Sequence, residues 1–124
     1  MSAQPNDKPL ILICDDEEGI RESLKLVLED YYTLHFVRNG LEALEALKTL
    51  KPSVMLLDIK MPKLSGMETL KSIRSFRPKL PIVMVTGYQS VETAQEAIRN
   101  GATDYIPKPF ESKHLLKTVA DLIK

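Results

Sequence analysis

The feature of this sequence that most restricts its fold is a regular alternation of short apolar runs with longer amphipathic segments. Each run has the length of a strand, and each is followed by a segment with the i, i+3, i+4 spacing of a helix. Short, continuously apolar strands are typical of a parallel sheet that helices cover on both faces. We therefore predict a single α/β domain. The expected strands are 10–14, 33–37, 54–57, 82–85 and 104–106, the second of them near an edge of the sheet.

The expected helices have recognisable starts and stops. The first covers 17–30, and the second and third begin at Asn39 and Ser65, each with a glutamate at the capping-box position three residues later. The fourth covers 90–100 and stops at Asn100-Gly101, and the fifth runs to the end of the chain. The side chains expected to face the sheet are Ile20, Leu24, Val27, Leu28, Leu41, Leu44, Leu47, Met67, Leu70, Ile73, Val91, Ala94, Ala97, Ile98, Leu115, Leu116, Val119, Leu122 and Ile123.

Composition restricts any charge-driven function to a local site. The 124 residues suffice for one core, and the 17 basic and 17 acidic side chains cancel, so no overall field attracts nucleic acid or an anionic membrane. The single cysteine, Cys14, excludes an internal disulfide, and its apolar run predicts that it packs as a small hydrophobe. No apolar stretch approaches the ~18 residues that span a bilayer, and the start lacks the apolar segment of a signal peptide. We expect residues 1–8 to be a disordered lead, residues 9–124 to form the domain, and the protein to be cytoplasmic.

Polar side chains gather where four of the expected strands end. Asp15 and Asp16 follow the first strand, Asp58 follows the third, Thr86 the fourth, and Lys108 the fifth. Taken singly, each has a simpler explanation, since such an aspartate often caps a helix, such a threonine forms a turn, and a lysine between prolines is usually solvated. Ligands of open α/β sheets, however, bind beyond the carboxyl ends of the strands. We therefore expect these side chains to share one site.

Three neighbouring carboxylates favour a bound cation. They cannot all stay ionised within a few ångströms of one another unless a positive charge holds them. An all-oxygen set without His or Cys suits a hard ion, and Mg²⁺ keeps several waters that a phosphoryl group could replace. A lysine and a hydroxyl would then receive the other phosphoryl oxygens. Glu17 and Glu18 are assigned instead to the first helical turn, where acids favour the macrodipole.

With these motifs in order, residues 8–124 resemble the receiver domain of two-component response regulators, most closely the receivers of NtrC-type regulators. The resemblance implies a flavodoxin-like, doubly wound (βα)5 sheet with strand order 2-1-3-4-5. The motifs that carry it are Asp15-Asp16, LLDIKMPKLSG at 56–66, VTG at 85–87 and DYIPKPF at 104–110.

The resemblance also implies a role for each acidic residue. Asp58 matches the phosphoacceptor. Asp16 and Asp58 would ligate Mg²⁺ through their side chains, Lys60 through its backbone carbonyl, and Asp15 largely through water. The loop after the phosphorylation site matches at Met61-Pro62 and Gly66.

Further matching positions would bind the phosphoryl group and respond to it. Lys108 would pair with the phosphoryl oxygens, Thr86 would hydrogen-bond to one of them, and Gly87 would leave the pocket open. Tyr105 matches the aromatic switch that turns inward when the threonine moves, although an aromatic on a short edge strand is more often ordinary packing. The Lys108-Pro109 peptide bond is expected to be cis.

The function implied is that of a signalling switch. A histidine kinase, or a phosphotransfer protein, would donate the phosphoryl group to Asp58. The surface formed by the fourth helix, the fifth strand and the fifth helix would then change and control an output such as transcription. The resemblance also implies that a homodimer can form through this surface. The chain would promote only its own phosphorylation and dephosphorylation. The large side chains of Lys60 and Tyr88 are expected to hinder attacking water and lengthen the phosphorylated state. His35 and His114 adjoin no part of the site.

Other functions agree less well with the motifs. A flavodoxin-like cofactor binder needs a phosphate cradle after the first strand, where this chain has DDEEG, and phosphatases resembling haloacid dehalogenases carry a DxD motif there. A nucleic-acid binder would need a basic patch or motif. The alternative that stays open is a degenerate receiver that binds proteins without phosphorylation, against which the complete set of five site residues argues.

Overall fold

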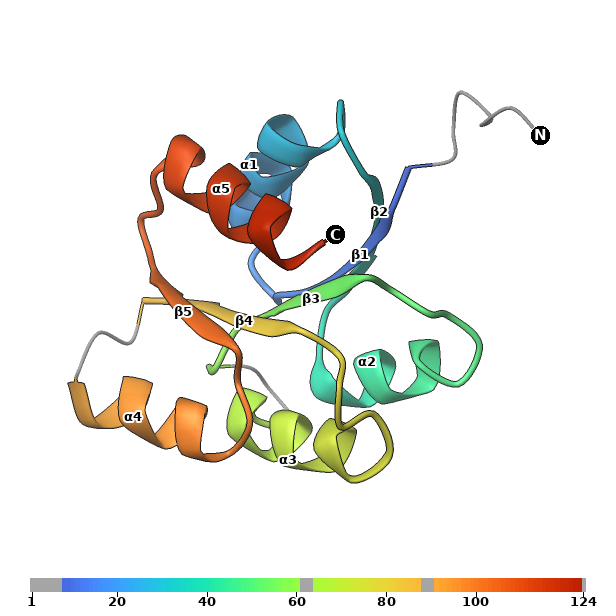
Figure 1. The fold of residues 1–124 in the computed structure, drawn as a ribbon, viewed down its shortest axis with the longest axis vertical. Coiled ribbons are helices and arrows are strands. Elements are labelled where there is room, and N and C mark those ends of the chain that lie inside the picture. Colours follow the sequence, from blue (N-terminus) through green and yellow to red (C-terminus); the bar gives the residue numbers. More distant parts are fainter. Residues whose placement is uncertain (1–7, 61–63, 88–90, 124) are drawn as a thin grey trace.

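The five apolar runs form one parallel sheet in the computed structural model, which describes residues 8–60, 64–87 and 91–123. The strand order is β2-β1-β3-β4-β5, and every neighbouring pair is parallel (Figure 1). The expected order and the expected edge position of the second strand are therefore confirmed. The strands are β1 (Leu10–Cys14), β2 (Thr33–Val37), β3 (Val54–Leu57), β4 (Ile82–Thr86) and β5 (Asp104–Pro107).

Helices cover both faces of the sheet. One face carries α1 (Glu18–Leu28) and α5 (Ser112–Leu122), and the other carries α2 (Gly40–Ala46), α3 (Gly66–Phe76) and α4 (Val91–Arg99) (Figure 1). Alternate side chains of each strand therefore enter two separate cores, because the side-chain period of a strand is two. In β1, Ile11 and Ile13 pack toward α1 and α5, while Leu12 and Cys14 pack toward α2 and α3.

The predicted helix starts are present, with one difference in detail. The Ser65 hydroxyl accepts the Glu68 N–H, and the Glu68 carboxylate accepts the Ser65 N–H, so this capping box is complete. The Asn39 side chain likewise accepts the Glu42 N–H. The Glu42 carboxylate, however, accepts the N–H of Arg38, one residue before the cap. The pairing is therefore displaced by one residue from a capping box.

Two side chains expected to face the sheet lie outside it. Leu41 is 53% exposed and Ile98 is 48% exposed. In each helix a neighbouring alanine takes the inward position, Ala43 in α2 and Ala97 in α4. Residue 98 follows Ala97 and is turned from it by roughly 100° around the helix, which carries Ile98 out of the contact.

The last helix is shorter than expected. It ends at Leu122, and Ile123 has an extended backbone, with φ −98° and ψ 103°. Ile123 nevertheless packs against the core beneath α5, as its apolar character requires. Within the described part of the chain, no helix is both long and apolar enough to cross a membrane.

Candidate functional site

The two central strands carry a carboxylate each to the same edge of the sheet. Asp15 follows β1 and Asp58 follows β3, and these strands are neighbours. The ladder continues beyond them, since the N–H of Asp58 donates to the Cys14 carbonyl at 3.1 Å and that of Asp15 to the Val37 carbonyl at 3.1 Å. Asp15 is 2% exposed and Asp58 is 4% exposed. Backbone hydrogen bonds therefore hold two buried carboxylates side by side.

A third carboxylate completes an acidic cluster. Asp15, Asp16 and Asp58 each offer an oxygen, and these oxygens lie within 4.8 Å of one another. In an octahedral Mg²⁺ site, opposite ligand oxygens are about 4.2 Å apart, because each lies about 2.1 Å from the ion. Asp16 is exposed and Asp58 buried, so the cluster opens toward solvent on one side. In its chemistry, an all-oxygen set of carboxylates, this donor set fits Mg²⁺.

Lys108 places its ammonium group among the acids. Its Nζ lies 2.8 Å from Asp15 Oδ2, 3.0 Å from Glu17 Oε1 and 3.5 Å from Asp58 Oδ2. Burial alone lowers the pKa of Lys108, but its hydrogen bonds to Asp15 and Glu17, together with the charges of Asp15 and Asp58, raise that pKa above its usual value. The lysine therefore stays charged. The Lys108-Pro109 bond is cis, as expected, and the Lys108 N–H donates to the Thr86 carbonyl at 2.9 Å.

Two hydrogen bonds to Asp15 hold the loop after β1. The N–H of Glu17 donates to Asp15 Oδ1 at 2.9 Å, and Nη1 of Arg21 donates to the Asp15 carbonyl at 2.9 Å. Burial raises the pKa of Asp15 even though Lys108 and the Glu17 N–H act in the opposite direction. The structure thus adds Glu17 and Arg21 to the site, two residues that the sequence did not single out. Glu17 differs from Glu18 by no local signal, and Arg21 lies in α1, six residues after Asp15.

Thr86 and Gly87 lie at the end of β4, the strand next to β3. Thr86 is 1% exposed at the end of β4. Among the residues that the structure describes, a Cβ added to Gly87 would meet nothing within 4 Å.

Tyr105 lies on β5, the strand next to β4, and its ring packs against the core that α2, α3 and α4 cover. Its hydroxyl is buried and makes no hydrogen bond to any residue that the structure describes. Burial, together with the charge of Asp58, raises the pKa of Tyr105. The side chain of Tyr105 is therefore partly buried, with its hydroxyl enclosed.

Two further positions are shaped by close packing. A Cβ at Gly66 would overlap the carbonyl oxygen of Asp58, and the Gly66 N–H donates to the Ile59 carbonyl at 2.7 Å. The absence of a side chain at Gly66 thus lets α3 start directly beneath the Asp58 backbone. Cys14 is 1% exposed, and burial raises the pKa of its thiol, which agrees with a packing role.

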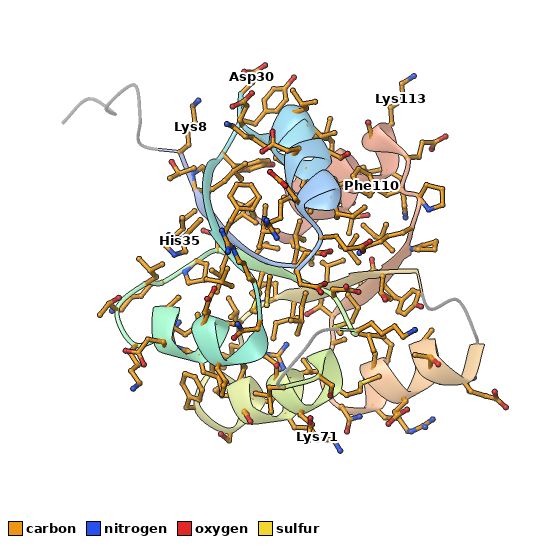
Figure 2. All side chains as sticks on the ribbon, turned by 180° about the vertical axis from the view of Figure 1, so that it is seen from behind. Lys8, Asp30, His35, Lys71, Phe110 and Lys113 are labelled. Carbon is orange, nitrogen blue, oxygen red and sulfur yellow. The ribbon has the colours of Figure 1, made fainter. Side chains whose placement is uncertain are left out.

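The remaining residues singled out from the sequence are the two histidines, Lys60, and residues outside the described part of the chain. His35 lies on the edge strand β2 (Figure 2) and His114 on α5, and both are exposed. Lys60 is exposed two residues after Asp58. Met61, Pro62 and Tyr88 are outside the residues that the structure describes, as are residues 1–7 of the expected N-terminal lead.

Comparisons with known proteins agree with this geometry. Residues 11–120 match the family model described as the response regulator receiver domain. The chain is 42% identical over 107 residues to the regulatory protein AtoC of Escherichia coli strain K12, covering 85% of this chain and 23% of AtoC. It is 37% identical to the response regulator MprA of Mycobacterium ulcerans, covering 92% of this chain and 50% of MprA. The chain thus spans about a quarter to a half of the length of these curated relatives.

Solved structures give the same result. The receiver domain of NtrX from Brucella abortus has a TM-score of 0.86 at 34% identity, covering 91% of this chain and 97% of that one. A BeF3-activated receiver domain, that of DrrB, has a TM-score of 0.86 at 25% identity, covering 93% and 97%. The expected likeness to receivers of NtrC-type regulators is confirmed by the sequence relatives. The chain belongs to the response regulator receiver domain family and forms a receiver domain of a two-component signalling switch.

Proposed function

We propose that the chain accepts a phosphoryl group on Asp58 with the help of Mg²⁺. The observation that supports this most strongly is the meeting of three carboxylates with a buried ammonium group at one edge of the sheet. A purely structural ion pair would need one acid for Lys108, whereas here the acids outnumber the lysine. Bound Mg²⁺ would neutralise negative charge on the carboxylates and on the incoming phosphoryl oxygens.

The protein would contribute to this reaction mainly by positioning the reacting groups and by stabilising negative charge. A carboxylate oxygen of Asp58 attacks phosphorus, the bond from phosphorus to the donor breaks in line, and the donor leaves with the electron pair. Lys108 moves its ammonium the short distance from Asp58 to the phosphoryl oxygens, where negative charge develops. Asp16 and Asp58, the backbone carbonyl of Lys60, and Asp15 through water would hold Mg²⁺. Later hydrolysis of the acyl phosphate restores the Asp58 carboxylate.

Phosphorylation would then shift an equilibrium between two arrangements of the domain. Thr86 hydrogen-bonds the phosphoryl group beside Gly87, and Tyr105 occupies the space inside the sheet that the threonine leaves. Reversing a 1:99 population needs about 5.5 kcal/mol of differential binding. A few charge-assisted hydrogen bonds of ~1.5–3 kcal/mol each suffice for this. The surface that responds is the one formed by α4, β5 and α5.

The partners follow from the family. The phosphoryl donor is a histidine kinase or a phosphotransfer protein, and the responding surface is offered to an output domain or to a second copy of the chain. The similar protein ZraR is named a transcriptional regulatory protein, which supports transcription as the output. A receiver that works only as a phosphorylation-independent binding module is less consistent with a complete set of Asp15, Asp16, Asp58, Thr86 and Lys108.

Intact mass spectrometry after incubation with acetyl phosphate tests the proposal. The parent is expected to gain one phosphoryl group, about 80 Da, with Mg²⁺ and not with EDTA. Asp58→Ala, the matched control, is expected to gain nothing. A gain that is equal in EDTA, or that persists in Asp58→Ala, would contradict the proposal, and so would the absence of any gain in the parent.

A further inference from the structure

The ammonium group of Lys108 has one acidic neighbour that stands outside the metal cluster. Glu17 Oε1 lies 3.0 Å from Lys108 Nζ, closer than Asp58 Oδ2 at 3.5 Å. The three carboxylates around Lys108 differ in exposure, since the Glu17 side chain is 61% exposed whereas those of Asp15 and Asp58 are 3% and 4% exposed. Among the described residues, the cluster that could hold a metal contains Asp15, Asp16 and Asp58 but not Glu17.

This difference determines which of the three contacts of Lys108 would persist when a metal ion and a phosphoryl group are bound. Lysine has three N–H donors. Here Nζ of Lys108 donates hydrogen bonds to Asp15 and Glu17 and forms a longer ion pair with Asp58. A metal ion would engage Asp15 and Asp58, and a phosphoryl group would cover Asp58. Glu17 would keep its full charge throughout, because it lies outside the cluster. It is therefore the carboxylate that continues to compete with the phosphoryl oxygens for Lys108.

We propose that Glu17 is a positioning residue that holds Lys108 toward the β1 side of the site and so limits the affinity of the domain for the phosphoryl group. This rests on the proposed phosphorylation of Asp58. The Glu17 carboxylate lowers the affinity for the phosphoryl group in two ways. It attracts the ammonium away from Asp58, and it adds negative charge beside the place where phosphoryl oxygens would lie. Removing the charge should release Lys108 to the phosphoryl group.

The substitution Glu17→Gln tests this with little risk to the fold. Glu17 precedes α1 as its N-cap, but its side chain makes no capping hydrogen bond, so the start of the helix does not depend on the carboxylate. Glu18→Gln is the matched control. Glu18 is the next residue, is exposed, carries the same charge, and makes no ion pair within the described part of the chain.

The measurement is the affinity for beryllofluoride, an analogue of the phosphoryl group, at saturating Mg²⁺ by isothermal titration calorimetry. Glu17→Gln is expected to bind about two- to fivefold more tightly than the parent, the range for an ion pair with one exposed partner. Glu18→Gln is expected to change the affinity by less than half of that factor. A second readout needs neither metal nor analogue: the NMR order parameter of the Lys108 ε-methylene group should fall in Glu17→Gln and stay at the parent value in Glu18→Gln.

Equal affinity changes in the two variants would overturn the inference, because the effect would then be general electrostatics. Weaker binding by Glu17→Gln, or an unchanged Lys108 order parameter, would overturn it as well. Failure of the proposed function is distinguishable from these results. In that case the parent itself would bind no beryllofluoride, whereas failure of the inference alone leaves binding by the parent intact.

Discussion

Tyr105 buries a hydroxyl group that has no hydrogen-bond partner among the described residues. Such a group loses its bonds to water without replacement, which costs stability. Tyr105→Phe should therefore raise the free energy of unfolding by about 1 kcal/mol at neutral pH. Urea unfolding monitored by circular dichroism measures this, and a decrease would show that the hydroxyl is satisfied in solution.

The same residue predicts a pH dependence. The folded-state pKa of Tyr105 is raised above its unfolded value of about 10, first by burial and then by Asp58. The unfolded chain therefore releases this proton at a lower pH than the folded chain. The associated stability is present below pH ~10 and is lost as the pH rises through the folded pKa. Between pH ~10 and the folded pKa, the parent should lose stability more steeply with pH than Tyr105→Phe, and parallel profiles would contradict the assignment.

Lys60 and Tyr88 lead to a kinetic prediction. Lys60 is an exposed residue two positions beyond Asp58, and Tyr88 follows Gly87. Both side chains are large, so we expect them to hinder the water that hydrolyses the acyl phosphate. The double variant Lys60→Asn, Tyr88→Ala should lose its phosphoryl group faster than the parent, as followed by intact mass over time. An unchanged or slower rate would contradict this prediction.

At the scale of elements, two arginines, one in the last turn of α3 and one at its C-cap, join the carboxyl ends of three helices. Arg74 Nε donates to the Gly101 carbonyl after α4 at 2.8 Å, and its Nη1 donates to the Arg77 carbonyl at 2.8 Å. Arg77 Nη2 donates to the carbonyls of Leu47 and Leu50 after α2, at 2.7 and 3.1 Å. These bonds satisfy carbonyls that a helix end leaves without partners. The end of α4 farther from the site is thereby anchored to α3.

Arg74→Met should destabilise the domain, because it keeps much of the aliphatic stem and removes both hydrogen bonds. We expect a loss of about 1–3 kcal/mol in the free energy of unfolding, the cost of unpaired partly buried acceptors. Amide hydrogen exchange should accelerate near Gly101 more than near β1. Lys71→Met, at an exposed position of the same helix, is the control and should change little. Equal effects of the two variants would refute the anchoring role.

The elements were largely predictable because their signals are local. The apolar runs, the cap at Asn39 and the capping box at Ser65 depend on residues a few positions apart, and all three are present. The inward expectation for Leu41 and Ile98 was wrong, because which face of a helix is buried depends on how closely the helix approaches the sheet. Ala43 and Ala97 take the buried positions there. That approach is a tertiary property that periodicity does not contain.

The functional site, like the elements, was predictable from the sequence only in part. Asp15 and Asp58 could be foreseen together because parallel strands carry their carboxyl ends to one edge. The pairing of Lys108 with Glu17, and of Arg21 with the Asp15 carbonyl, could not. Both contacts depend on how α1 is oriented after the loop. In addition, the acidic run DDEE contains no sequence signal that separates Glu17 from Glu18.

At the scale of the whole molecule, negative side chains gather at one edge of the sheet, although the net charge of the chain is zero. The chain has 17 basic and 17 acidic side chains, yet three carboxylates meet at that edge. Because Mg²⁺ would bind this folded cluster and not the unfolded chain, it should stabilise the fold by RT ln(1 + [Mg²⁺]/Kd), about 2.7 kcal/mol at 100 Kd. Urea unfolding with Mg²⁺ and with EDTA measures the difference. Asp16→Asn should reduce it strongly, and equal stabilisation of parent and variant would contradict a metal site here.

The central claim is that Asp58 carries the phosphoryl group, and borohydride trapping tests it most directly. Sodium borohydride reduces an aspartyl phosphate to homoserine but leaves a free carboxylate and a phosphoester unchanged. After treatment with acetyl phosphate and Mg²⁺, peptide mass spectrometry should find homoserine at position 58, and nowhere in a sample prepared with EDTA. Homoserine at another aspartate, or none at all in a sample shown to carry the phosphoryl group, would contradict the assignment of Asp58.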